Sequence, residues 1–83
     1  MDAIAAAVHE YILDEFLPGA RPSELTETTP LISGGIVDSL ATLKLVSFLE
    51  ERYGIAIAPH EASVDYFDTV RQIADLVRAK QAR

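Results

Sequence analysis

The chain has 83 residues, a net charge of −6 and a sequence pI near 4.6, so we expect residues 1–83 to form one small domain with one modest core. Hydrophobic residues make up 49% of the chain and charged residues 24%, a composition typical of a folded globular protein. The negative charge makes nucleic acid and anionic membrane surfaces poor partners, because both would repel it. Mixed or basic protein surfaces are better candidates.

The sequence contains no cysteine, which excludes disulfides, catalysis by a cysteine thiolate and a cysteine-based metal site. The chain could therefore handle a thioester only through the thiol of a prosthetic group. Its start lacks the basic region of a signal peptide, and its longest apolar run, Ala3 to Val8, is too short to span a membrane. We expect a cytoplasmic monomer without a membrane span.

Apolar residues at three- and four-residue steps predict a first amphipathic helix over about residues 2–17. Asp2 stands at the positive end of this helix, and Pro18-Gly19 ends it. His9 lies away from the apolar stripe, so we expect it to be a surface residue rather than a metal ligand or a base.

Residues 18–37 form a long connection that contains Pro18, Pro22 and Pro30. Loops of about twenty residues are uncommon in compact domains and usually have a function. A short helical turn fits Ser23 to Thr26. The apolar residues that could hold the loop against the helices are Leu25, Leu31, Ile32, Ile36 and Val37.

A second helix is predicted from about Ser39 to Tyr53, with Gly54 at its end. Leu45 lies off the main apolar stripe, where it could belong to the core or to a docking patch, and we expect it in the core. The expected buried face of this helix consists of Leu40, Leu43, Val46 and either Phe48 or Leu49.

Two more helices are predicted after an extended linker at residues 55–57. A short one over about residues 60–67 would use Val64, Tyr66 and Phe67 as apolar anchors. Asp68-Thr69 then caps a last helix over about residues 70–80, with Arg71, Arg78 and Lys80 on its outside and residues 81–83 beyond its end. The expected fold is all-α: a small antiparallel bundle of three main helices and one short helix, with a long first loop.

Asp38 and Ser39 stand where the long loop becomes the second helix. Both residue types cap helix starts, because a side-chain oxygen can accept from the unpaired backbone N–H groups there. On their own these two residues predict only a cap. The pattern is longer, however. It resembles the attachment motif of the acyl carrier proteins and aminoacyl (peptidyl) carrier proteins at Leu31, Gly35, Asp38, Ser39 and Leu40.

The resemblance extends over the whole chain, since this family also has a long first loop and a short third helix. It implies that a phosphopantetheinyl transferase attaches 4'-phosphopantetheine from coenzyme A to Ser39, with Asp38 and Leu40 as parts of the recognised motif. The thiol of the group would hold its cargo as a thioester. An adenylation-type ligase would load an acyl or aminoacyl group, and a downstream transferase or synthase would receive it.

The resemblance also implies that partner enzymes recognise surfaces around the second helix. Two acids at the negative end of a helix gain nothing from its dipole, which favours a role as a handle for basic partners; a solvated surface is the alternative. The expected partner-binding residues are Leu40, Leu43, Lys44, Glu50 and Glu51.

The stretches 35–40 and 66–69 are most similar to stand-alone D-alanyl and other aminoacyl carrier proteins. Ala41 and Lys44 occupy positions that are often acidic in fatty-acid carriers. We therefore expect a dedicated pathway that loads an amino acid, or a secondary-metabolite pathway with a specialised acyl group. A polyketide or fatty-acid type carrier is the alternative.

We do not expect an enzyme. Ser39 with a histidine, His9 or His60, would supply parts of a catalytic triad, but the sequence around the serine is not a G-x-S-x-G elbow. Metal-binding and phosphate-binding loop patterns are absent from the sequence, so no metal is expected. The competing hypothesis is an unmodified helical protein-interaction module, which the same helices and acidic residues would serve.

Overall fold

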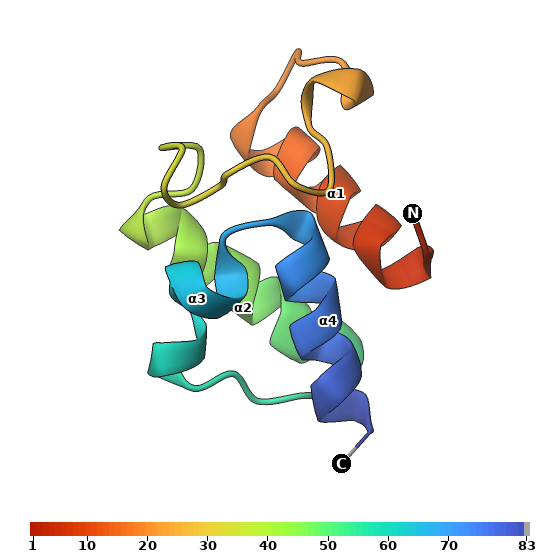
Figure 1. Cartoon of the computed structure of the whole chain (residues 1–83), viewed down its shortest axis with the longest axis vertical. Helices are drawn as coiled ribbons and strands as arrows, with labels where there is room; N and C mark the ends of the chain where they lie inside the picture. The colour runs from red at the N-terminus through yellow and green to blue at the C-terminus, as the bar shows by residue number, and fades with distance from the viewer. Residues whose placement is uncertain (83) are drawn as a thin grey trace.

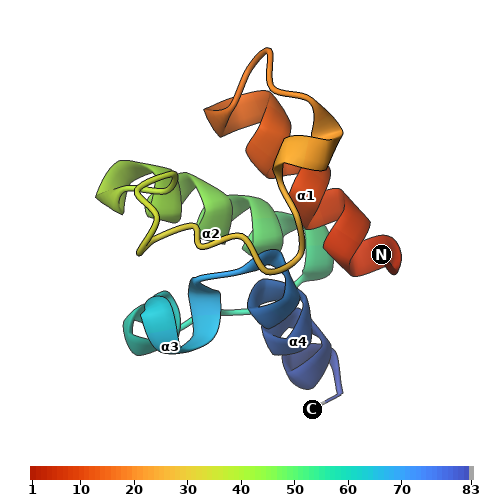
Figure 2. The same ribbon diagram turned by 45° about the horizontal axis from the view of Figure 1, so that its top comes forward.

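The computed structural model describes residues 1–82 and consists of α-helices, two short 3₁₀ helices and connecting loops. The three long helices pack around one core, and the short α3 lies beside α2 and α4 (Figures 1 and 2). This confirms the expected all-α bundle of three main helices and one short helix. The elements are α1 (Ala3–Phe16), η1 (Pro22–Glu24), α2 (Ser39–Tyr53), η2 (Pro59–Glu61), α3 (Val64–Phe67) and α4 (Val70–Gln81).

The core takes apolar side chains from every α-helix and from the long first loop. Among the described residues, no polar or charged residue is buried with them. The helix α4 buries Val70, Ile73, Ala74 and Val77 and packs mainly against α1 and α3. The buried residues are Ala5, Val8, Ile12, Leu25, Leu31, Val37, Ala41, Leu45, Leu49, Ile57, Phe67, Val70, Ile73, Ala74 and Val77.

The buried face of α2 differs from the predicted one. Ala41, Leu45 and Leu49 enter the core at steps of four residues, whereas Leu40 and Leu43 are 64% and 65% exposed. The expectation that Leu40 and Leu43 are core residues was therefore wrong, and the expectation for Leu45 is confirmed. Apolar residues cover so much of this helix that the spacing alone is compatible with either stripe.

Contacts with α1 fix the rotation of α2. The Tyr11 ring stacks on Phe48 with 4.1 Å between the ring centres, and the Tyr11 hydroxyl donates to the backbone carbonyl of Lys44 at 3.2 Å. Burial raises the pKa of this hydroxyl. Because the aromatic pair occupies one flank of α2, the side chains of Leu40 and Leu43 are turned towards solvent.

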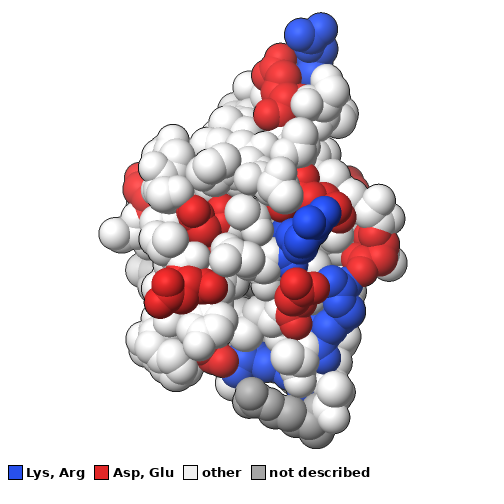
Figure 3. All heavy atoms as spheres, viewed as in Figure 1, with Lys and Arg blue, Asp and Glu red and all other residues white. Residues whose placement is uncertain are grey.

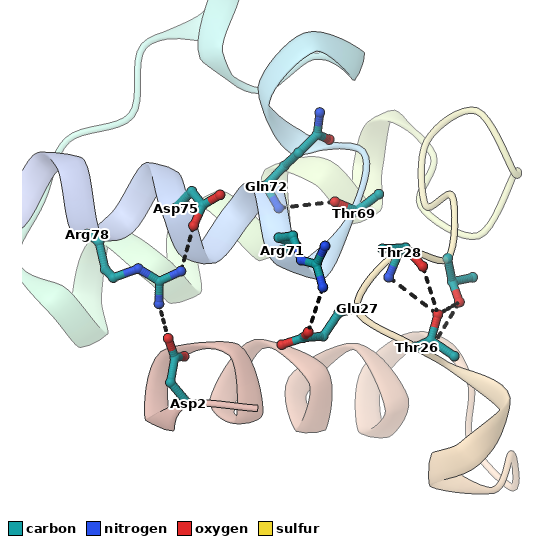
Figure 4. Close-up of polar contacts among 10 residues, drawn as sticks. Asp2, Thr26, Glu27, Thr28, Thr69, Arg71, Gln72, Asp75 and Arg78 are labelled. Carbon is teal, nitrogen blue, oxygen red and sulfur yellow. Dashed lines mark hydrogen bonds and ion pairs between the residues drawn. The ribbon is translucent and has the colours of Figure 1, made fainter.

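Polar side chains cap the long helices. Asp2, Asp38 and Thr69 each accept a hydrogen bond from the backbone N–H three residues later, at 2.8, 2.8 and 3.0 Å. Figure 4 shows the cap at Thr69. Gly54 ends α2 in the left-handed conformation, with φ +64°, which glycine adopts without strain. The last helix continues one residue further than predicted, to Gln81, and Arg83 lies outside the described residues.

The predicted helix over residues 60–67 is divided into η2 and α3. Ser63 interrupts it with an extended backbone, at φ −132° and ψ 174°. Phe67 is fully buried, but Val64 and Tyr66 are 47% and 49% exposed. The expectation that all three residues are apolar anchors was therefore correct only for Phe67, because a helix this short buries one side.

The long first loop is held in place by side chains of α1 and α4. His9 Nε2 lies 3.1 Å from the carbonyl oxygen of Pro22 and 2.6 Å from that of Leu25, so its N–H donates to the loop. Arg71 donates its backbone N–H to the Glu27 carbonyl at 3.0 Å and its guanidinium to the Glu27 carboxylate at 3.3 Å (Figure 4). His9 is therefore half-buried and structural rather than a plain surface residue.

The basic side chains of α4 all pair with nearby acids within residues 1–82. Arg78 contacts Asp2 and Asp75 (Figure 4). Lys80, which we expected on the outside, is only 10% exposed and lies 2.7 Å from Glu61. Figure 3 shows the face seen in Figure 1. On this face the Lys and Arg side chains lie over α4 and the first loop, and acidic and uncharged side chains lie over α3.

Within residues 1–82, every helix is too short or too polar to cross a membrane.

Candidate functional site

Ser39 is the first residue of α2, and its side chain is exposed. The Asp38 carboxylate next to it accepts from the backbone N–H of Ala41 at 2.8 Å, and the Asp38 carbonyl accepts from the Thr42 hydroxyl at 2.8 Å. None of the hydrogen bonds formed among residues 1–82 uses the Ser39 hydroxyl. Asp38 therefore does the capping, and the serine beside it has a hydroxyl that another molecule can reach.

The loop before Ser39 closes on itself in a small ring, residues 31–37. The carbonyl oxygen of Leu31 accepts from the N–H groups of both Ile36 and Val37, each at 2.9 Å. The side chains of Leu31 and Val37 are 0% and 2% exposed, so they anchor both ends of the ring in the core. The position of Ser39, two residues after Val37, is thereby fixed relative to the core.

Two glycines allow this ring to close. Gly35 has φ +80°, a conformation that side chains other than glycine's adopt only with strain. A Cβ atom on Gly34 would lie 2.3 Å from the carbonyl oxygen of Pro30, which is closer than such atoms can approach. The ring therefore requires glycine at position 34 for space and at position 35 for conformation.

An open groove of about 700 Å³ begins beside Ser39 and runs between α2 and the segment that contains η2 and α3. Its walls are mostly apolar, so it could cover a nonpolar group that extends from the serine. Its lining includes Ile32, Val37, Leu43, Pro59, Ala62 and Val64.

The structure separates the expected partner-binding residues. Leu40, Leu43 and Lys44 are exposed on the first turns of α2, close to Ser39. Glu51 is also exposed, further along the helix. Glu50 is half-buried, and its Oε2 accepts from the backbone N–H of Ile57 at 3.0 Å. The Glu50 carboxylate therefore has a local role that the dipole argument does not cover, since it ties α2 to the following linker.

Sequence reasoning missed residues of the C-terminal half that lie near this site. Val64 lines the same groove as Ser39. Asp68 accepts hydrogen bonds from the backbone N–H groups of Ile32 and Ser33 at 2.8 and 2.9 Å, and from the Ser33 hydroxyl at 2.7 Å. These contacts join residues about 35 positions apart, so local spacing gives no signal for them.

The surroundings of the Asp68 carboxylate shift its pKa. Burial alone would raise its pKa, but the hydrogen bonds from the Ser33 hydroxyl and from the backbone N–H groups of Ser33 and Ile32 favour the charged form. The pKa of Asp68 is therefore lowered from its ordinary value. This aspartate is charged at neutral pH and holds the loop as an acceptor.

The histidines do not complete a triad with Ser39. His9 is bound to the first loop, and His60 is exposed on η2. Within residues 1–82 there is also no group of three or more His, Asp or Glu side chains placed to hold a metal ion. What the site offers is an accessible hydroxyl on a fixed scaffold.

Comparison with known proteins identifies the kind of scaffold. Residues 17–77 match the family described as phosphopantetheine attachment site. The chain is 35% identical over 72 residues to the probable acyl carrier protein PigG of Serratia sp. (strain ATCC 39006), an alignment that covers 87% of this chain and 82% of that protein. It is also similar to the solved structure of apo KstB-PCP, with a TM-score of 0.70 and 29% identity over 90% of this chain and 82% of the other.

The start of α2 fits a phosphopantetheine group. The group is joined through a phosphodiester, and the first turn of a helix stabilises negative charge through its N–H groups and its dipole. The open groove beside Ser39 leaves room for an arm, and the chain has no cysteine thiol that would compete with the thiol of the group. This chain therefore belongs to the carrier-protein family, whose members hold acyl or aminoacyl cargo as a thioester on covalently attached 4'-phosphopantetheine.

Proposed function

We propose that Ser39 is the residue that bears the 4'-phosphopantetheine. The observation that supports this most strongly is its exposed hydroxyl at the first residue of α2, free of hydrogen bonds within residues 1–82. Two other serines near Ser39 have hydroxyls that are already engaged in hydrogen bonds. The Ser33 hydroxyl donates to Asp68 at 2.7 Å, and the Ser63 hydroxyl donates to the carbonyl of His60 at 2.9 Å.

In this proposal the chain itself catalyses nothing. It supplies the Ser39 hydroxyl and the surface that a phosphopantetheinyl transferase recognises, with Asp38 and Leu40 beside the serine. The transferase joins the Ser39 oxygen to the phosphopantetheine phosphorus of coenzyme A, whose phosphoanhydride bond breaks and releases adenosine 3',5'-bisphosphate. The hydroxyl proton passes to a base of the transferase. Once loaded, the chain presents its thiol to partner enzymes, which carry out all later chemistry.

The partner surface surrounds Ser39 on α2 and α3. Exposed apolar side chains gathered beside a functional group are typical of protein interfaces. Leu40 and Leu43 are 64% and 65% exposed on α2, and Val64 and Tyr66 are 47% and 49% exposed on α3. Lys44 adds a positive charge to the α2 side. We include Glu51 at the edge of this surface and leave out Glu50, because its carboxylate already bonds to Ile57.

We propose that the cargo is an amino acid or a specialised acyl group, loaded by an adenylation-type ligase in a secondary-metabolite pathway. The exposed Lys44 supports this over a fatty-acid carrier, because basic charge replaces acidic charge on the docking helix. Ala41 is buried, with only 8% of its surface exposed. Its small side chain is explained by core packing and carries no information about partners. PigG is named a probable acyl carrier protein, which makes an acyl cargo, as in a polyketide or fatty-acid type carrier, the second candidate.

Intact-protein mass spectrometry tests the attachment residue. The chain is incubated with coenzyme A and a promiscuous phosphopantetheinyl transferase, beside Ser39→Ala and the control Ser47→Ala, which changes another exposed serine of α2. We expect the parent and Ser47→Ala to gain one phosphopantetheinyl unit and Ser39→Ala to gain none. Loading of Ser39→Ala would refute the assignment.

The cargo class is tested on the loaded protein. Adenylation-type ligases that activate amino acids, and ligases that activate acyl groups, are offered with ATP and their substrates, and thioester formation is followed by mass. Faster charging with amino acids supports an aminoacyl carrier. Charging by the acyl-activating ligases alone would favour the polyketide-type alternative.

A further inference from the structure

Asp68 lies at the junction of α3 and α4, outside the attachment motif, yet it holds the loop that leads to Ser39. Its Oδ1 accepts from the backbone N–H groups of Ile32 and Ser33 at 2.8 and 2.9 Å, and its Oδ2 accepts from the Ser33 hydroxyl at 2.7 Å. Its backbone carbonyl accepts from the N–H of Leu31 at 2.7 Å. One residue therefore binds three consecutive residues of the loop.

Asp68 is itself held firmly from its own side. Its backbone N–H donates to the side-chain oxygen of Gln72 at 2.8 Å, and the side-chain nitrogen of Gln72 donates to the carbonyl of Asp65 at 3.2 Å. The neighbouring residues Phe67 and Val70 are fully buried. A carboxylate fixed by packing and by further hydrogen bonds can hold its partners precisely.

The connection from Asp68 to Ser39 is short. Asp68 binds the beginning of the ring at residues 31–33, and the Leu31 carbonyl binds Ile36 and Val37 at its end, at 2.9 Å each. Beyond Val37 only Asp38 separates the ring from Ser39. If the Asp68 carboxylate were lost, the ring would keep its buried ends but lose the bonds that hold Ile32 and Ser33.

We propose that Asp68 is a positioning residue for the modification of Ser39, which fixes the loop so that the serine hydroxyl meets the transferase in one orientation. This inference rests on the proposed function of Ser39. Orientation matters because a reacting group held in the productive geometry avoids an entropic cost, and small misplacements slow group transfer. Asp68 acts only through the loop, since none of its described hydrogen bonds reaches Ser39.

Two substitutions of Asp68 separate its hydrogen-bonding role from its charge. Asp68→Ala removes every side-chain acceptor. Asp68→Asn keeps an oxygen for the N–H groups of Ile32 and Ser33, and its amide can donate to the Ser33 hydroxyl. We expect kcat/KM for phosphopantetheinyl transfer to fall about tenfold in Asp68→Ala, which corresponds to about 1.4 kcal/mol, with the loss in kcat rather than KM. Asp68→Asn should retain most of the parent rate.

The control is Thr69→Ala, which removes the cap of α4 next to Asp68 but no hydrogen bond to the loop. It should load at the parent rate even if it is less stable. Amide hydrogen exchange gives a second readout. Exchange at the amides of Ile32 and Ser33 is compared with exchange at the core amides of the same variant. It should be about tenfold faster in Asp68→Ala, the factor that corresponds to the same 1.4 kcal/mol. In Thr69→Ala it should be unchanged from the parent.

The outcomes are distinguishable. Loading of Asp68→Ala at the parent rate, or equal slowing of Asp68→Ala and Thr69→Ala, would overturn the positioning role while leaving the Ser39 assignment intact. A parent protein that is not loaded at Ser39 would overturn the proposed function, and this inference with it.

Discussion

Lys80 Nζ lies 2.7 Å from Glu61 Oε1, and the two side chains are only 10% and 13% exposed. The same Glu61 oxygen accepts from the backbone N–H of Ala58 at 2.9 Å. This pair joins the end of α4 to η2, just before the short helix α3, which flanks the proposed attachment site at Ser39. It is the least exposed ion pair formed within residues 1–82.

Lys80→Met should lower thermal stability more than Arg21→Met. The methionine leaves the Glu61 carboxylate covered and without its partner, which is costly for a charged group. Arg21 and Glu24, in contrast, are 82% and 51% exposed, and such surface pairs contribute little. Thermal unfolding followed by circular dichroism measures both effects. Equal melting temperatures for the two variants would show that the Lys80 pair behaves as a surface pair.

Leu45→Ala and Leu43→Ala test the observed rotation of α2. Leu45 is fully buried, so its truncation should cost about 2–5 kcal/mol. Leu43 is 65% exposed, and its truncation should change stability by no more than about 0.5 kcal/mol. Urea unfolding measures both. A larger loss of stability in Leu43→Ala than in Leu45→Ala would support the buried face predicted from the sequence instead.

Gly34→Ala should damage the ring before Ser39. The new Cβ would lie 2.3 Å from the Pro30 carbonyl, and relieving such overpacking costs about 1–3 kcal/mol. Gly19→Ala is the matched control, because Gly19 has φ +88° but nothing within 4 Å of its Cβ position. Both variants should lose stability, but only Gly34→Ala should slow the loading of Ser39. Equal rates of Ser39 loading in Gly34→Ala and Gly19→Ala would contradict the role assigned to the ring.

Acid should destabilise the fold through three carboxylates. The Glu61 pKa is lowered mainly by its hydrogen bond from Lys80, the Asp2 pKa mainly by the backbone N–H of Ala5, and the Asp68 pKa is lowered despite its burial. A lowered folded-state pKa contributes stability above the unfolded value and loses it as the pH falls through the folded value. The ordinary values here are 3.8 for aspartate and 4.5 for glutamate.

The melting temperature should therefore fall as the pH drops from about 5 through the lowered pKa values. Lys80→Met should flatten part of this fall, because Glu61 then loses the main contact that lowers its pKa. Thermal unfolding from pH 7 to pH 3 checks this. An unchanged pH profile in Lys80→Met would show that the pair does not govern the titration of Glu61.

Leu43→Gln and Val64→Gln should weaken recognition by partner enzymes without unfolding the chain. Both side chains are exposed beside Ser39, so their loss removes apolar docking area but no core packing. Each should raise KM for the phosphopantetheinyl transferase by about three- to tenfold, as expected for about 1 kcal/mol of lost contact. Glu10→Gln, on the exposed side of α1, is the control. Equal KM values in all three variants would place the docking surface elsewhere.

The sequence predicts the helices well because their signals are local. Asp2, Asp38 and Thr69 are caps and Gly54 is a helix end, and each acts within a few residues of its position. The buried face of α2 could not be predicted, because its apolar residues are compatible with two different buried faces. These residues are Leu40, Leu43, Leu45, Val46, Phe48 and Leu49. The contacts of this helix with α1 and with α4 decide between them.

The resemblance to the attachment motif can be seen in the sequence, but the contacts that hold the loop before Ser39 cannot. The bonds from Asp68 to residues 31–33 and from His9 to Pro22 and Leu25 join segments that are distant along the chain. Glu50 and Lys80 were expected on the surface, because their charge gives no sign of their local partners. The pairing of such groups depends on how the helices pack.

Site mapping of the loaded protein tests the central claim most directly. After incubation with coenzyme A and a phosphopantetheinyl transferase, the protein is fragmented and the modified residue is located by tandem mass spectrometry. We predict one phosphopantetheinyl unit, on Ser39. A modification on Ser33, Ser47 or any other residue, or none on a chain whose helical fold is verified by circular dichroism, would contradict the account.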